Sequence, residues 1–169
     1  MRFLPFEKFT LKTKMSVEDA KNKLAQNLAE RKWLRFPLLS SIDKPFEGTI
    51  TNDTFDINRV IRYRNSFMPF VFGKFSKTHD GTEIEIKMRP NMAVVVFMSF
   101  WMFIVGSVSV FMIGNIVFTS DQFSPFFLIP IVMFLFGYLL IMGGYNIERG
   151  KTKSLLIDLF NATEISKEK

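Results

Sequence analysis

Hydrophobic and polar residues alternate through most of the first 90 positions, after which the chain becomes almost continuously apolar. The apolar part holds two runs, residues 92–118 and 125–145, and its only charged residue, Asp121, lies between them. Since a helix needs about 20 apolar residues to cross a bilayer, each run is long enough to span one. The pattern therefore predicts a transmembrane helical hairpin over residues 91–146.

Alternation with a period of two predicts antiparallel strands with one buried and one solvated face. Stretches of this kind follow one another between residues 45 and 89 and are separated by turn-forming residues. They predict a four-stranded meander, preceded by a further strand around Phe9 and Leu11. One of the four strands is expected to run from Phe55 to Tyr63.

The strand expected from Phe67 to Phe75 differs from the others because both of its faces are apolar. A central strand that is covered on both sides would explain this pattern. Alternatively, its second face meets the membrane, the C-terminal tail or a partner. Pro69 favours an edge position or a bulge near the start of this strand.

Two helices are predicted outside the apolar runs. The first is capped by Ser16 and is expected to end near Lys32, followed by a short strand over residues 33–38. The second is an amphipathic helix over residues 151–162, after Gly143-Gly144 ends the second span. This tail helix either packs on the sheet or lies along the membrane surface, and its weakly basic polar side favours the sheet.

These elements predict an α+β membrane protein in three parts. Residues 1–90 form a small cytoplasmic antiparallel-sheet domain with one packed helix, and residues 91–146 form the two-helix transmembrane hairpin. Residues 147–169 form a C-terminal amphipathic helix and tail, also cytoplasmic. The hairpin is therefore expected to be an insertion between the meander and the last helix of the same domain.

The distribution of charge predicts the orientation in the membrane. Residues 1–90 hold 17 Lys and Arg residues and the tail holds 5, whereas the segment between the two runs holds none. The positive-inside rule then places both termini in the cytoplasm. Juxtamembrane residues that face anionic lipid explain the net charge of +6, so nucleic acid is not an expected partner. The abundance of Phe, Lys, Ile and Asn favours a bacterial inner membrane.

Candidate chemistry is sparse. The chain has no cysteine and a single histidine, His79, in a turn-forming tract, so we expect no metal site and no cofactor. Neither apolar run carries an ionisable residue, which argues against a proton relay or an ion pathway. Glu83 and Glu85 are expected to form cross-strand pairs with Arg62 and Arg64 rather than a catalytic carboxylate pair. No catalytic residue is therefore assigned.

Arg59 is the most informative polar residue, because it occupies one of the alternate positions of its strand that otherwise hold apolar side chains, between two isoleucines. A buried arginine must be paired and hydrogen-bonded, or must contact an anion. One interpretation pairs Arg59 with an internal carboxylate or places it at the sheet edge. The other makes Arg59, with Arg62, Arg64 and Asn65, a binding site for a phosphate or a lipid head group.

Three functional hypotheses follow. The first is a non-enzymatic membrane protein whose cytoplasmic domain binds a protein partner or anionic lipid, or assembles into a homo-oligomer. The second is a membrane-perturbing or pore-forming effector that oligomerises through small residues of the first run, although neither run has the polar face that a water-filled channel needs. The third is a lipid-directed enzyme, which requires the arginines and glutamates to converge in one pocket. We favour the first.

Overall fold

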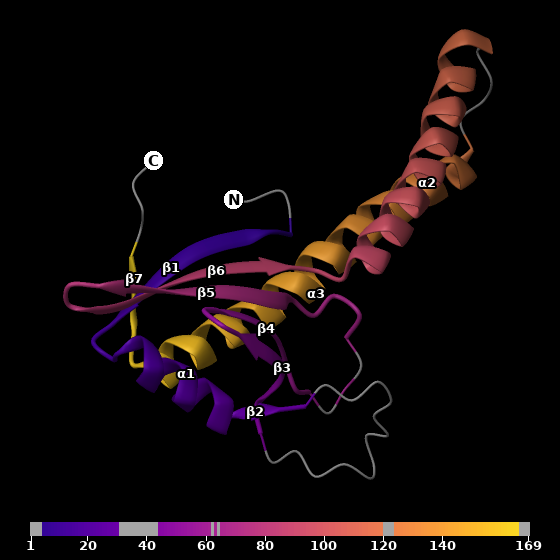
Figure 1. The fold of residues 1–169 in the computed structure, drawn as a ribbon. Helices are drawn as coiled ribbons and strands as arrows, with labels where there is room; N and C mark the ends of the chain where they lie inside the picture. The colour runs from indigo at the N-terminus through magenta and orange to yellow at the C-terminus, as the bar shows by residue number, and fades with distance from the viewer. Residues whose placement is uncertain (1–4, 31–43, 62, 64, 120–123, 166–169) are drawn as a thin grey trace.

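Figure 1 shows the computed structural model of the chain, which describes residues 5–30, 44–61, 63, 65–119 and 124–165. Over these residues the chain is an α+β fold with a mixed seven-stranded sheet and three α-helices. The strands are β1 (Glu7–Thr13), β2 (Leu28–Ala29), β3 (Phe46–Thr51), β4 (Thr54–Arg59), β5 (Phe70–Thr78), β6 (Gly81–Arg89) and β7 (Thr163–Ile165). The helices are α1 (Val17–Gln26), α2 (Met92–Thr119) and α3 (Leu128–Phe160), and a 3-10 turn, η1 (Pro125–Phe127), precedes α3.

The sheet has the strand order β2-β3-β4-β5-β6-β1-β7. Neighbouring strands are antiparallel except for β2 and β3, which are parallel. The predicted meander is confirmed as β3 to β6, and β1 extends it. Strand β1 pairs with β6 from Glu7 opposite Met88 to Thr13 opposite Thr82, so the first strand of the chain lies beside the strand that leads into α2.

One face of the sheet is covered by α1 and by the C-terminal part of α3 (Figure 1). Leu24 of α1 and Leu156 and Phe160 of α3 are fully buried in the same core as the inward side chains of the strands. The Phe160 ring meets the Phe75 ring of β5 edge-on, with 6.0 Å between ring centroids. The prediction that the tail helix packs on the sheet is confirmed, since burying these apolar side chains against the strands stabilises both.

The second apolar run and the tail form one unbroken helix, so the prediction that the second helix ends at Gly143-Gly144 is wrong. Glycine inside a helix costs only about 1 kcal/mol, which tertiary contacts can offset. At Gly144 the missing side chain is required, because a Cβ there would lie 2.9 Å from Cδ2 of Phe67. Beyond the glycines, the buried residues recur every three or four positions along one face of α3. They are Tyr145, Glu148, Thr152, Leu156 and Phe160.

Helix α2 and the first part of α3 project together away from the sheet as an antiparallel hairpin (Figure 1). Both are long and apolar enough to cross a membrane, and most of their surface is uncovered. The two helices approach closely at Gly137, which is buried beside Trp101 and Met102.

Two strands are shorter than the alternation predicts. Strand β4 ends at Arg59 instead of continuing to Tyr63, and β5 begins at Phe70 instead of Phe67. The intervening segment leaves the sheet because Tyr63 hydrogen-bonds to α3 and Phe67 packs on it. Pro69 accordingly precedes β5, where its missing N–H removes no ladder bond.

Helix α1 begins as predicted, since the Ser16 hydroxyl accepts a hydrogen bond from the Asp19 amide at 3.1 Å. It ends at Gln26 and not near Lys32, because the chain turns at Asn27 and pairs as β2 with β3. The short strand predicted over residues 33–38 lies outside the described residues.

The second face of the sheet, which we call the open face, is not covered by any of the helices that the structure describes. Strand β5 is central, as predicted, but no described helix provides the cover predicted for its second face. Its Phe72 lies on this open face under the Arg89 guanidinium, 4.4 Å from the ring centroid. Glu83 and Glu85 face residues of β1 and β5 across the sheet, and Arg62 and Arg64, the partners predicted for them, lie outside the described residues.

Glu83 lies opposite Lys12 of β1 and Ser76 of β5, and Glu85 lies opposite Thr10 and Lys74.

Candidate functional site

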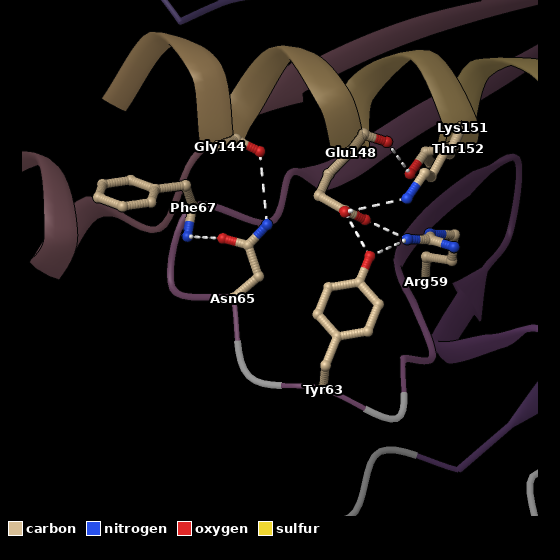
Figure 2. A network of polar contacts seen from close by, with 8 residues as sticks. All are labelled: Arg59, Tyr63, Asn65, Phe67, Gly144, Glu148, Lys151 and Thr152. Carbon is tan, nitrogen blue, oxygen red and sulfur yellow. Dashed lines mark hydrogen bonds and ion pairs between the residues drawn. The ribbon is translucent and has the colours of Figure 1, made fainter. Parts of the chain in front are cut away.

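The buried ion pair between Arg59 and Glu148 is the centre of the polar network in Figure 2. Arg59 is the last residue of β4, and Glu148 lies on the sheet-facing side of α3, 89 positions later in the chain. The Arg59 Nη2 atom donates to Glu148 Oε2, and the glutamate side chain is only 2% exposed. The Arg59 Nε atom is buried and has no partner among the described residues.

Tyr63 completes the contact from the segment that follows β4. Its hydroxyl donates to Glu148 Oε1 and accepts from Arg59 Nη2 at 3.2 Å (Figure 2). Lys151 adds a weaker attraction, with its Nζ 3.7 Å from Glu148 Oε1 and 5.8 Å from the Tyr63 ring centroid. The carboxylate is therefore held by two donors and a nearby cation, which is what a buried charge requires.

The same segment makes a second contact with α3 one turn earlier. The Asn65 Nδ2 donates to the Gly144 carbonyl at 3.4 Å, and Asn65 Oδ1 accepts from the Phe67 amide at 3.0 Å (Figure 2). Phe67 packs over Gly144. The segment between β4 and β5 is thus attached to α3 at two successive turns.

Strand β6 is attached to α3 at the same level. The buried Tyr145 hydroxyl donates to the Met88 carbonyl at 3.1 Å, one residue before β6 ends and four residues before α2 begins. Together, Arg59, Tyr63, Asn65 and Met88 hold α3 where it leaves the hairpin and enters the sheet domain. We call this set of contacts the α3 clamp.

A second ion-pair cluster lies further along α3. The largely buried Glu7 of β1 binds Arg149 Nε at 3.2 Å and Lys153 Nζ at 3.3 Å. Lys153 also pairs with Glu164 of β7 at 2.7 Å. The basic residues of α3 therefore form ion pairs with glutamates of the same fold.

The pKa of Glu148 is lowered from the ordinary value of a glutamate. Burial raises this pKa, but the hydrogen bonds from Tyr63 and Arg59 and the charges of Arg59 and Lys151 lower it by more. Glu148 lies beyond the apolar run, in the part of α3 that packs on the sheet. The α3 clamp is consequently built around an ionised carboxylate at neutral pH.

Acid is expected to loosen the α3 clamp. Because the folded pKa of Glu148 lies below the unfolded one, its contribution to stability is fully present above the unfolded pKa and is lost as the pH falls through the folded pKa. The thermal unfolding midpoint of the full chain in detergent should decrease as the pH falls below the ordinary pKa range of a glutamate. Glu148→Gln should make this decrease smaller. An unfolding midpoint that depends on pH equally in the wild-type chain and in Glu148→Gln would contradict the role of the ionised Glu148 in the α3 clamp.

The structure shows the contacts of two of the four predicted site residues. Arg59 is paired with an internal carboxylate, which is the first of the two interpretations given above, and Asn65 binds the α3 backbone. Arg62 and Arg64 lie outside the described residues. Glu148 is not among the predicted site residues, although it continues the face that Tyr145 begins, because Gly143-Gly144 indicates a helix end in the sequence.

The described residues contain no group of three His, Asp or Glu side chains that could hold a metal ion. The chain matches no protein-family model, no curated protein and no solved structure.

Proposed function

We propose that this protein is a non-enzymatic membrane-anchored module that presents its α+β domain at the cytoplasmic surface of a bilayer. The hairpin would cross the membrane with both termini in the cytoplasm, and the domain would bind a protein partner or anionic lipid or assemble with further copies. The observation that carries this proposal is the continuity of α3, which runs from the uncovered apolar hairpin into the core of the sheet domain.

The α3 clamp supports this proposal because it prevents the domain from rotating about the helix. A domain joined by a flexible linker samples many orientations, whereas one built around a continuous helix has a single orientation relative to that helix. With Tyr145 bonded to Met88 and Glu148 bonded to Arg59, both helices of the hairpin join the sheet at one level. Such a joint suits a module that displays a fixed surface to a partner.

The surface of the hairpin favours an anchor over a pore. Phe103, Val110 and Phe111 of α2 are each more than 70% exposed, and such apolar surface suits contact with lipid rather than with water. The enzyme hypothesis required Arg59 and Glu83 to converge. They lie instead on opposite faces of the sheet, since Arg59 contacts α3 and Glu83 alternates with the buried Ile84.

Cysteine labelling tests the insertion and the orientation. The chain contains no cysteine, so a single introduced thiol reports its own location. A membrane-impermeant maleimide applied to intact cells should label Ser120→Cys, between the two apolar runs, and should label Lys77→Cys of β5 only after permeabilisation. The wild-type chain is the unlabelled control. The reverse labelling would contradict the orientation, and release of the wild-type chain by alkaline carbonate would contradict insertion.

A further inference from the structure

Three basic side chains gather on the open face of the sheet at the end that leads into the hairpin. Lys87 and Arg89 alternate with the buried residues of β6, and Lys8 of β1 lies directly opposite Lys87. All three are exposed. We call Lys8, Lys87 and Arg89 the basic patch.

No ion pair between described residues neutralises the basic patch, although Glu85 lies two residues before Lys87 on the same face of β6 and lines the same surface depression. Like charges directly opposite each other on neighbouring strands are destabilising, so the Lys8–Lys87 pair has no structural benefit of its own. Among ion pairs between described residues, none involves a member of the patch, whereas Arg149 and Lys153 are bound by Glu7. Arg89 is held over the Phe72 ring, which orients its guanidinium without neutralising it.

The basic patch lies at the level where the bilayer surface is expected. Helix α2 begins three residues after Arg89, a distance of about 10 Å in an extended chain. Its 28 residues give a length of about 42 Å, which matches a bilayer with its head-group layers. Arg89 then lies within about 10 Å of the cytoplasmic head-group layer, and Lys87 and Lys8 lie further from this layer along β6 and β1.

An apolar cavity of about 240 Å³ lies between α2 and α3 at the end of the hairpin that joins the sheet. Val95 and Met98 of α2 and Ile141 of α3 form part of its wall, and Phe6 and Pro90 close the end toward the sheet. Pro90 directly follows Arg89, and Phe6 precedes Lys8 by two residues. The cavity is partly open to the outside, and Phe6 in its wall is 45% exposed.

We propose that the basic patch and this cavity together bind one anionic phospholipid of the cytoplasmic leaflet. Lys8, Lys87 and Arg89 contact the phosphate, and an acyl chain enters the cavity between α2 and α3. The ligand chemistry follows from the site, because unpaired cations beside an apolar cleft at the membrane surface fit a molecule that is anionic at one end and apolar at the other. This inference rests on the membrane insertion proposed above.

The head-group contact is tested with the full chain reconstituted in nanodiscs of phosphatidylcholine that contain a variable fraction of phosphatidylglycerol. Bound lipid is counted by native mass spectrometry after release into a mild detergent. Since each basic residue near the surface contributes roughly a fivefold gain, the triple variant K8Q/K87Q/R89Q should lose on the order of 100-fold in its preference for phosphatidylglycerol. The charge-matched control K14Q/K74Q/K77Q, which changes exposed lysines further from the hairpin, should keep the preference.

The acyl-chain contact is tested with two neighbouring substitutions on α2. Val95→Trp fills the cavity and should displace the retained phospholipid, whereas Val96→Trp, at a residue that is 63% exposed and does not line the cavity, should leave it in place. Inorganic phosphate alone should not raise the unfolding temperature of the wild-type chain, because it lacks the apolar part of the ligand.

The head-group contact would be contradicted if K8Q/K87Q/R89Q kept its preference for phosphatidylglycerol, or if K14Q/K74Q/K77Q lost it equally. The acyl-chain contact would be contradicted if Val95→Trp retained the phospholipid, or if phosphate alone stabilised the wild-type chain. Each of these leaves the chain in the membrane fraction, so the proposed anchor would stand. If alkaline carbonate instead extracts the wild-type chain, the anchor itself is wrong.

Discussion

Phe160→Ala is expected to destabilise the sheet domain by about 3–5 kcal/mol, the usual cost of removing a buried phenylalanine. Phe160 is fully buried and lies edge-on to Phe75, although it belongs to the last turn of the helix that starts in the hairpin. Hydrogen–deuterium exchange of the β5 and β6 amides in the detergent-solubilised chain measures the effect, since the slowest amides report global opening of the domain.

Leu155→Ala is the matched control for Phe160→Ala. Leu155 lies on the same helix but is 37% exposed, so its truncation should change the exchange of the same amides much less. Equal protection in Phe160→Ala and Leu155→Ala would show that the end of α3 is not part of the domain core. The expected difference would instead show that the end of α3 stabilises the core that residues 1–90 form with it.

Glu148→Ala is expected to cost about 3 kcal/mol, because it leaves the Arg59 guanidinium without its carboxylate. This value lies at the low end for a broken buried pair, since the Arg59 side chain remains 14% exposed and keeps some contact with water. The loss should open the α3 clamp locally. Exchange of the backbone amides between β4 and β5, including that of Phe67, should then rise more than exchange within β6.

Two further variants separate loss of the ion pair from loss of charge. Asp158→Ala removes an exposed carboxylate from the same helix and should have little effect. The double variant Arg59→Met with Glu148→Leu should recover much of the stability, because apolar side chains can replace a buried ion pair at little cost. A double variant as unstable as Glu148→Ala would show that the pair itself, and not the unpaired charge, stabilises the joint.

Much of the architecture follows from local patterns. The strands of the meander show period-two alternation, and Ser16 caps α1 through the contact that its position predicts. The apolar helices are evident from their length alone. These features depend on residues close together in the chain, where spacing determines which side chains share a face.

The predictions from sequence are wrong where a contact between distant residues outweighs a local preference. Gly143-Gly144 is a plausible helix end, but Phe67 packs on Gly144 and the helix continues. Tyr63 has the parity of a strand residue, but its hydroxyl bonds to Glu148 and the strand ends at Arg59. In both cases a contact between β4–β5 and α3 provides more stabilisation than the local signal.

The sequence by itself determined that Arg59 needed an anionic partner, since a guanidinium at a buried strand position cannot remain unpaired. It also determined the two long apolar helices, because each run is long and apolar enough to cross a membrane as a helix. Only the tertiary structure decided that the partner is Glu148, 89 residues away, and that Lys8 and Lys87 meet across two strands. The physical reason is that sequence spacing limits the faces on which side chains lie, whereas their contacts depend on how distant elements pack.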